Sequence, residues 1–569
     1  MYKSLLTTLP CLFLTLSLMG QNQYENLSEY ARINTTGPNI SINVVDADGD
    51  GWEDIYVGRI GEANQFFLNN GDGTFNEIAA IVGIADEGLS YTSIWGDLDN
   101  DGDADLYVGN RNSANRLYRN EGNAVFTDIT EEAGVGYESA PRSLLLSDVD
   151  RDGWLDIYVA NLDDENVLYR NNGDGTFTDT TQMSGALDNQ LSLGAIFFDY
   201  DQDGDSDLYL THDNNQPNIL YQNDGNGQFT DVSESSNTDY AGFGMGVATG
   251  DVNGDGWLDI YITNLYDNIL LLNDGDGTFT DITSTAGIND YGMGWGTTFL
   301  DFDNDGLLDL YTVNDSYFSP YDNVLYRNQG DNTFTIVSDD QPESSPYGAY
   351  GTATLDLNKD GRLDLLVSNT GANGGNQYFE NVVGSPGKWL QIKLRGTISN
   401  RDAIGAQLTL YAGDQLWRQE VYGGSGYASQ NSLWQHFGLG EVEQLDSMHI
   451  RWPNGMEETF YDIPAEQFLV YTEGSGWTST STLDPQQLAT LYPNPVADSE
   501  AYLQFSSETT GSARVVLLNA QGQIVREVYE GKLVVNQQLP IPVAELPAGV
   551  YWLRLQAEER TTAWQLVKP

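Results

Sequence analysis

The sequence predicts an all-β protein made of a seven-bladed propeller, a small β domain and a C-terminal β-sandwich. Three observations support this prediction. The acidic cassette Asp-x-Asp-x-Asp-Gly-x-x-Asp, with Asn at its third position in two copies, occurs seven times, and its copies begin 51, 51, 51, 52, 50 and 55 residues apart. Each unit of roughly fifty residues contains four short apolar runs separated by turn residues. Because no helical periodicity accompanies these runs, the units are typical of propeller blades.

Residues 1–20 have the composition of a signal peptide. Lys3 precedes an apolar run from Leu5 to Met19, which is too short to span a membrane as a helix. The single cysteine, Cys11, lies inside this run. After cleavage near Gly20, the exported chain would therefore depend on sheets and metal ions, rather than disulfides, for its stability. No other segment is expected to span a membrane.

Residues 21–384 hold the seven repeated units. In the second unit an apolar run, Tyr91 to Gly96, precedes the cassette, and a strand-like run, Leu106 to Val108, follows it. In the third unit the segment from Asn166 contains Asn-Gly and Asp-Gly steps, which are typical of a hairpin between two further strands. Four strands per unit and seven units predict a seven-bladed ring.

The N-terminus is expected to close this ring. Residues Tyr24–Ala31 are similar to the last strand of a blade, such as Phe126–Ala133, and no good copy of that strand follows the seventh cassette. We therefore expect the N-terminal segment to supply the outer strand of the last blade. Closure of this kind removes exposed sheet edges.

Each cassette predicts a calcium site. Carboxylates at positions 1, 3 and 5 converge when the loop coils, and glycine at position 6 permits the sharp bend. Position 7 offers its carbonyl, and Asp at position 9 can close the shell with two oxygens. This all-oxygen set suits Ca²⁺ better than Mg²⁺. An acidic surface turn is one alternative, which seven copies in register disfavour. A paired EF-hand or dockerin array is the other, but the last ligand of those loops is at position 12 and leads into a helix, whereas here position 9 leads into a strand.

About seven Ca²⁺ ions are therefore expected. The expected side-chain ligands are Asp46, Asp48, Asp50 and Asp54; Asp97, Asp99, Asp101 and Asp105; Asp148, Asp150, Asp152 and Asp156; Asp199, Asp201, Asp203 and Asp207; Asp251, Asn253, Asp255 and Asp259; Asp301, Asp303, Asp305 and Asp309; and Asp356, Asn358, Asp360 and Asp364. The expected carbonyl ligands are those of Trp52, Asp103, Trp154, Asp205, Trp257, Leu307 and Arg362. Asn253 and Asn358 lower the charge of two sites, which are expected to bind more weakly.

The strand order places all the cassettes on one face of the ring. The loops between strands two and three, and between blades, lie on the opposite face and vary from unit to unit. Variable loops on a rigid scaffold often carry function. Candidate ligand-binding residues there are His212, Tyr317, Phe318 and Tyr321, whose aromatic members could stack on sugar rings. Local packing of the insertion Asp315–Tyr321 is an equally good explanation of these aromatic residues.

The cassettes resemble the FG-GAP/VCBS repeats of integrin-type propellers across roughly residues 24–384. This resemblance implies that Ca²⁺ stabilises the blade hairpins and that ligands bind the opposite face. Residues 385–474 contain ordered motifs, including Gly423–Tyr427 and His436–Gly440, that are similar to the ASPIC/UnbV domain. That family supplies no catalytic residues that carry over. Asp402, Tyr427 and His436 form a possible site in this domain, and packing is the alternative explanation for His436.

Residues 475–482 are rich in Ser and Thr and are expected to form a flexible linker. Residues 483–569 contain Leu491–Val496 and later strand-like runs, which resemble the type A sorting domain of the type IX secretion system. The resemblance implies export by that machinery, through the outer membrane of a Gram-negative bacterium, to the extracellular space or the cell surface. An ordinary fibronectin-like module is the weaker alternative.

Charge limits the partners. The chain has 24 Lys and Arg against 84 Asp and Glu, a net charge of −60. Such a surface repels nucleic acid and anionic membranes. We expect a secreted, non-catalytic calcium-binding protein that acts in adhesion or binds a glycan or another surface macromolecule. A Ca²⁺-dependent polysaccharide lyase or dehydratase, with His212 and Arg142 near the variable face, and a structural matrix component remain open alternatives.

Overall fold

The computed structural model describes residues 23–289, 291–316, 321–337, 348–384 and 386–479 continuously. Within the C-terminal region it describes 489–492, 500–505, 513–519, 524–532, 534, 537–544, 546–547, 549–557 and 560–568. The expected signal peptide, residues 1–20, lies outside the described residues. Among the residues that are described, no helix is long and apolar enough to cross a membrane.

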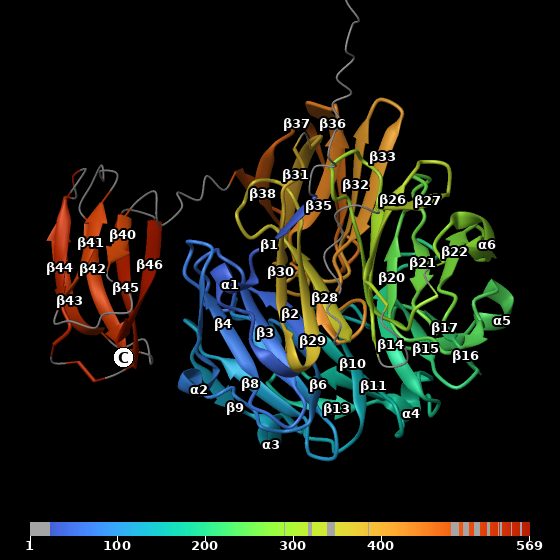
Figure 1. Ribbon diagram of the computed structural model, residues 1–569, viewed down its shortest axis with the longest axis horizontal. Helices are drawn as coiled ribbons and strands as arrows, with labels where there is room; N and C mark the ends of the chain where they lie inside the picture. Colours follow the sequence, from blue (N-terminus) through green and yellow to red (C-terminus); the bar gives the residue numbers. More distant parts are fainter. Residues whose placement is uncertain are drawn as a thin grey trace, which may run out of the picture.

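Seven antiparallel blades of four strands each form a ring, which confirms the predicted propeller (Figure 1). Five blades are separate sheets, and blades one and seven are joined into one sheet by pairing of Thr36–Val45 with Asp364–Gly375. From the innermost strand outwards, blades one to three are β2 (Thr36–Val45), β3 (Asp54–Arg59), β4 (Gln65–Asn69), β5 (Phe75–Glu77); β6 (Ser90–Gly96), β7 (Asp105–Asn110), β8 (Arg116–Asn120), β9 (Phe126–Asp128); and β10 (Pro141–Ser147), β11 (Asp156–Asn161), β12 (Val167–Asn171), β13 (Phe177–Asp179). Blades four to six are β14 (Ser192–Phe198), β15 (Asp207–His212), β17 (Ile219–Asn223), β18 (Phe229–Asp231); β20 (Val247–Gly250), β21 (Asp259–Ile262), β22 (Ile269–Asn273), β23 (Phe279–Asp281); and β24 (Gly294–Leu300), β25 (Asp309–Asn314), β26 (Val324–Asn328), β27 (Phe334–Ile336). A short pair, β16 (Gln216–Pro217) and β19 (Ala241–Gly242), links blades four and five.

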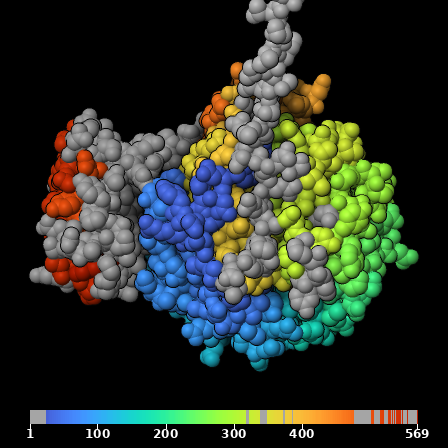
Figure 2. Space-filling view, in the orientation of Figure 1, coloured from blue at the N-terminus to red at the C-terminus, as the bar shows by residue number. Residues whose placement is uncertain are grey.

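The seventh blade combines both ends of the ring. Its strands are β28 (Ala349–Leu355), β29 (Asp364–Gly375), β30 (Gln377–Asn381) and the N-terminal β1 (Tyr24–Asn26). β1 pairs antiparallel with β30, with Tyr24 opposite Asn381 and Asn26 opposite Phe379. In Figure 2 the blue start of the ring accordingly lies beside its yellow end. The edge of β30 is therefore covered, as the N-terminal motif predicts.

Among the described residues, a one-turn helix follows the outer strand in six blades, where the sequence pattern predicts strand alone. The helices are α1 (Ser28–Ala31), α2 (Ala79–Val82), α3 (Thr130–Ala133), α4 (Thr181–Ser184), α5 (Ser233–Ser236) and α6 (Thr283–Ala286). Each ends at a residue with positive φ, which is Gly in four blades, Arg32 after α1 and Asn237 after α5. The motif Phe126–Ala133 is thus a three-residue strand followed by one helical turn. A four-residue helix is too short to show periodicity in sequence.

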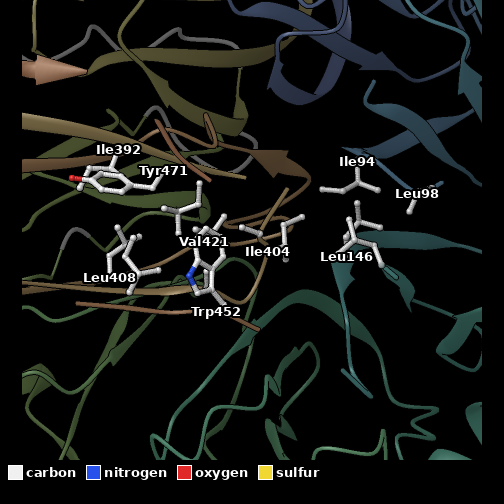
Figure 3. Close-up of a cluster of buried hydrophobic side chains, with 14 of the residues drawn as sticks. Ile94, Leu98, Leu146, Ile392, Ile404, Leu408, Val421, Trp452 and Tyr471 are labelled. Atoms are coloured by element: carbon white, nitrogen blue, oxygen red, sulfur yellow. The ribbon is translucent and has the colours of Figure 1, made fainter. Parts of the chain in front are cut away.

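Residues 386–479, which we call the middle domain, form two four-stranded sheets. One contains β31 (Lys388–Arg395), β35 (Gln435–Gly440), β38 (Gln467–Thr472) and β39 (Gly476–Ser479), and the other contains β32 (Gln407–Ala412), β33 (Gln415–Glu420), β36 (Gln444–Arg451) and β37 (Glu457–Pro464). β39 pairs with β38, so the predicted linker 475–482 begins as a strand. Figure 3 shows that side chains of this domain, such as Ile404 and Val421, join the same buried cluster as Ile94 and Leu146 of the propeller.

The C-terminal region forms a β-sandwich with its own core. One sheet contains β40 (Ala489–Tyr492), β41 (Glu500–Phe505) and β44 (Gln538–Pro542), and the other contains β42 (Ala513–Asn519), β43 (Ile524–Gly531), β45 (Gly549–Ala557) and β46 (Arg560–Lys568). Leu503, Val515, Ile541 and Leu553 lie fully buried between the sheets. The sandwich predicted for residues 483–569 is therefore present among the residues described there.

Candidate metal-loop face and axial channel

The seven cassettes join the first and second strands of their blades, and we call the face that carries them the loop face. In five loops, one oxygen from each of three aspartates lies within 4.8 Å of the others. These clusters are Asp46, Asp48 and Asp50; Asp97, Asp99 and Asp101; Asp148, Asp150 and Asp156; Asp199, Asp201 and Asp203; and Asp301, Asp303 and Asp309. The fifth and seventh loops have asparagine at position 3, so they offer fewer carboxylates. In the other five loops, three of the expected ligand side chains therefore converge.

Hydrogen bonds to the first aspartate coil each loop. In the second loop, Asp97 accepts from the backbone N–H of Asp101 (3.1 Å) and of Gly102 (2.7 Å). Asp101 in turn accepts from the N–H of Asp103 (3.0 Å). Gly102 has a φ of 103°, a conformation that a side chain would resist. The glycine at position 6 is thus required by the bend that brings the carboxylates together.

Several carboxylate oxygens in these clusters are buried without a hydrogen-bond partner among the described residues. They are Oδ1 of Asp46, Asp150 and Asp303. Burial, together with the nearby charges of Asp402, Asp101 and Asp99, raises the pKa of Asp97 to about 7. A bound cation would supply the missing partner and offset the repulsion between carboxylates. The donor set, all oxygen and strongly anionic, therefore fits a hard divalent ion.

The aspartate at position 9 has a second role that the sequence analysis missed. In the third loop, Oδ2 of Asp156 accepts from the N–H of Val149 (3.1 Å), and Oδ1 accepts from the N–H of Asn171 (2.8 Å). The same pair of bonds recurs in the other loops. Both oxygens are therefore already engaged with backbone, and this residue anchors its loop to the end of the third strand.

The asparagine at the end of the third strand links neighbouring blades. Asn171 donates from Nδ2 to the carbonyl of Leu98 in the preceding blade (2.8 Å) and to that of Leu155 in its own loop (3.1 Å). Equivalent bonds to the preceding blade are made by Asn120, Asn223, Asn273, Asn328 and Asn381. We call these residues the asparagine latches. Through these bonds, the acidic loops connect neighbouring blades of the ring.

Replacing a latch should destabilise the ring measurably. Asn171→Ala leaves the carbonyls of Leu98 and Leu155 without this buried donor, so we expect a loss of about 3 kcal/mol. The neighbouring Asn172 is exposed and bonds only within its turn, and Asn172→Ala is expected to cost less than about 0.5 kcal/mol. Urea unfolding in saturating Ca²⁺ compares the two midpoints. Equal midpoints for the two variants would show that the latch contributes nothing.

In four of the seven loops, the residue at position 4 connects its blade to the following one. Nδ2 of Asn100 donates to the carbonyl of Gly153 (2.9 Å), and Nε2 of Gln202 donates to that of Gly256 (2.8 Å). Lys359 of the last blade reaches the carbonyl of Gly51 in the first (2.9 Å). Each acceptor is the position-6 glycine of the next loop. These bonds link four pairs of neighbouring loops, whereas Gly49 and Gly254, at position 4 of the first and fifth loops, have no side chain to make one.

The middle domain sits on the loop face. Asp402 accepts from the N–H of Asp97 (2.7 Å), and Gln391 donates to Oδ2 of Asp356 (2.7 Å). Nε2 of His436 donates to Oδ1 of Asn304 (2.7 Å), while its Nδ1 has no partner among the described residues. Burial lowers the pKa of His436 to about 3, so the ring is neutral. Asp402 and His436 are therefore contacts between domains rather than parts of one site.

Residues Tyr422–Asn431, which we call the axial loop, run from the middle domain into the channel at the centre of the ring. The carbonyl of Gly423 accepts from the N–H of Leu146 (2.8 Å), and Ser429 and Gln430 pair parallel with β2. A Cβ on Gly423 would lie 2.2 Å from the carbonyl oxygen of Leu146. Gly423 therefore permits the axial loop to pass close to the inner strand β10.

Tyr427 lies at the tip of the axial loop, deep in the channel. Its ring centroid is 4.7 Å from that of Trp295, and it belongs to a cluster with Leu193 and Met245. Seven residues surround it, one from each blade. Each lies six positions before the first aspartate of its cassette, in the innermost strand or just before it. They are Ile40, Tyr91, Arg142, Leu193, Met245, Trp295 and Tyr350. We call these seven residues the mouth ring. Tyr91, Trp295 and Tyr350 are partly exposed.

Of the four candidate ligand-binding residues predicted from the sequence, only one is described and exposed to solvent in part. His212 is fully buried, and its ring is held by the carbonyl of Pro217 (2.6 Å) and by Oδ2 of Asp188 (2.9 Å). The expectation that His212 faces a ligand is therefore wrong, because both nitrogens are engaged inside blade four. Tyr321 is partly exposed, and Tyr317 and Phe318 lie outside the described residues. The mouth ring was missed, although its constant offset from the cassettes is visible in the sequence.

Comparison with known families agrees with this architecture. The FG-GAP-like repeat model matches residues 46–108, 97–159, 148–210, 199–262, 251–312 and 313–367. The chain belongs to the FG-GAP-like repeat family. In this FG-GAP protein, residues 396–477 match the ASPIC and UnbV model, and residues 490–568 match a secretion system C-terminal sorting domain. The three resemblances drawn from the motifs are therefore confirmed, and the sorting domain indicates secretion or a cell-surface location by type IX secretion.

The FG-GAP protein is also similar to curated proteins. It is 27% identical over 465 residues to cartilage acidic protein 1 of Xenopus tropicalis, covering 75% of this chain and 63% of the relative. Identity to the Homo sapiens protein of that name is 27% over 487 residues, covering 75% and 61%. The chain thus spans less than two thirds of these relatives. A solved structure of YCF48 bound to D1 peptide aligns with a TM-score of 0.42 at 8% identity, covering 64% of this chain and 98% of that one.

Proposed function

We propose that this secreted FG-GAP protein is a non-catalytic, calcium-stabilised adhesion protein that binds glycan at the mouth ring. The observation that carries this proposal is the position of the middle domain. It contacts the acidic loops, so a large ligand meets the opposite face of the ring. There the described residues place three partly exposed aromatic side chains, Tyr91, Trp295 and Tyr350, around one channel mouth.

Calcium is the ion that best suits the loops. The residues that would hold it are the aspartates and asparagines at positions 1, 3 and 5, the carbonyl at position 7 and the aspartate at position 9, in up to seven loops. Bound Ca²⁺ would supply positive charge that offsets the repulsion between the carboxylates. Because these loops also carry hydrogen bonds between neighbouring blades, holding their shape would help to hold the ring together.

An enzymatic role has less support at the same face. A lyase needs a base beside groups that neutralise a uronate. His212 is buried against Asp188, and His436, on β35 of the middle domain, is buried against Asn304 of the loop face. His449 lies on β36 of the middle domain, away from the mouth ring. Among the described residues, no histidine lies beside the mouth ring, and the tyrosines there are poor bases. Burial raises the pKa of Tyr427 to about 12, and burial together with the charge of Asp315 raises the pKa of Tyr350. This arrangement favours binding over proton abstraction.

A glycan array tests this proposal. We expect Ca²⁺-loaded protein to bind a subset of glycans, and Tyr350→Leu to reduce that signal at least about tenfold by removing one stacking surface. Tyr461→Leu is the matched control, because Tyr461 is 71% exposed on the middle domain and should leave binding unchanged. Absence of any glycan signal, or cleavage of a bound polysaccharide seen by mass spectrometry, would contradict the proposal.

A further inference from the structure

Arg142 is the one charged member of the mouth ring. The other six positions hold aliphatic, Met or aromatic side chains. Arg142 lies at the start of β10, six residues before Asp148, and its side chain is directed to the channel mouth beside Tyr91. Its guanidinium carbon lies 3.9 Å from the centroid of the Tyr91 ring. A cation is thus built into an otherwise apolar ring.

The charge of Arg142 has no carboxylate partner among the described residues. The residue is 5% exposed, and its recorded hydrogen bond runs from Nη1 to the carbonyl of Pro141 (3.0 Å). By contrast, two arginines of the adjacent blade two are ion-paired: Arg111 with Asp163 (3.1 Å) and Arg116 with Asp86 (3.1 Å). In a chain with 84 acidic and 24 basic residues, a nearly buried and unpaired guanidinium is unusual. Burying such a charge without a partner is costly.

The charge of Arg142 lies near Tyr427, at the tip of the axial loop. Burial raises the pKa of Tyr427 to about 12, and the positive charge of Arg142 opposes that rise. Tyr427 also contacts Trp295, which lies 5.0 Å from Tyr350 between ring centroids. One cation and several aromatic rings therefore converge at the same end of the channel.

We propose that the mouth ring binds a glycan through one carboxylated sugar, whose carboxylate pairs with the guanidinium of Arg142. This inference rests on the proposed glycan-binding function and names its ligand class. The planar guanidinium suits a carboxylate, because two parallel N–H···O bonds can form. The partly exposed faces of Tyr91 and Tyr350 offer the apolar surface on which a sugar ring can lie.

The neighbouring charges limit the ligand to a single acid group. Asp315 follows β25 and accepts from the phenol of Tyr350 (2.8 Å), and Asp213 follows β15 at the equivalent place in blade four. A polyanion or an acidic peptide would bring several negative charges close to these carboxylates. A glycan that ends in one uronic-acid-type sugar meets the cation and avoids most of that repulsion.

The test uses the full Ca²⁺-loaded protein and a matched pair of oligosaccharides. One ends in a uronic acid, and the other is identical except that the carboxyl is reduced to an alcohol. By isothermal calorimetry, we expect the acid to bind at least about tenfold more tightly than its neutral twin, which corresponds to about 1.4 kcal/mol. Arg142→Gln should abolish this preference while leaving the neutral twin bound. Arg111→Gln, which removes an ion-paired arginine of blade two, should leave the preference intact.

Each other outcome is decisive. Equal binding of the two sugars by the wild-type protein overturns the assignment to Arg142 and leaves glycan binding standing. Binding of neither sugar, with an empty glycan array, overturns the proposed function itself. A preference that survives Arg142→Gln also overturns the assignment. Should Arg142→Gln fail to fold, the wild-type comparison and Arg142→Lys decide, since lysine keeps the charge but loses the paired geometry. Competition by acetate as strong as that of the acid sugar would show an anion site without sugar recognition.

Discussion

Chelation with EGTA is expected to lower the melting temperature by at least about 10 °C. Each ion that binds only the folded state contributes about 2.7 kcal/mol at a hundredfold excess over its Kd. Each kcal/mol moves the melting temperature of a large domain by about 2–4 °C, so two occupied loops already account for this shift. The effect should be larger than for an ordinary surface site, because the loops accept the bonds of the asparagine latches and four of them bond to the following loop through position 4. Scanning calorimetry with and without Ca²⁺ measures it.

The controls separate calcium from general charge effects. Mg²⁺ should restore the melting temperature less well than Ca²⁺, since the smaller ion retains its waters. Asp101→Ala should remove one ion per chain by elemental analysis, whereas Asp174→Ala, which removes an exposed acid from a hairpin turn of blade three, should remove none. Far fewer than seven ions at saturation, or equal rescue by Mg²⁺, would argue against the calcium assignment.

Deleting Tyr24–Ile33 is expected to be the most damaging change to the ring outside the metal loops. The deletion strips β1 from β30 and removes the buried side chains of Tyr24 and Ile33, which are each worth about 1.5–3 kcal/mol. It also exposes the backbone of β30 as an edge strand, which favours association of chains. We expect a lower urea midpoint and oligomers in size-exclusion chromatography with light scattering.

A chain that begins at Gln23 is the matched control for this deletion. It loses the residues before β1 but keeps the strand, so it should remain monomeric at the concentrations at which the longer deletion aggregates. If the chain that lacks Tyr24–Ile33 is as soluble and as resistant to urea as this control, pairing of β1 with β30 does not stabilise the ring.

Repetition explains why so much of the propeller could be predicted. Seven copies of one cassette fixed the blade count, the hairpins and the convergence of the carboxylates, because each feature depends on residues close in sequence. The one-turn helices escaped prediction because four residues carry no periodic signal. The contacts of Asp402 and His436 with the loops each occur once and join residues hundreds of positions apart, so no local pattern reports them. His212 illustrates the opposite error, in which a residue in a variable loop region is buried by its own blade.

The axial loop also bears on how the chain reaches its folded state. Gly423, Gly426 and Ser429 form backbone bridges to the inner strands of three different blades, β10, β20 and β2, and Ser41 and Asn43 are buried polar side chains of β2. A ring folded without the middle domain would leave this channel unfilled. Since residues 386–479 follow the ring in the chain, we expect the axial loop to insert after the ring has formed, and the ring and the middle domain, β1 through β39, to unfold as one cooperative unit. Domain boundaries drawn from sequence motifs would cut this unit in two, so the propeller expressed alone should behave as an unfinished intermediate.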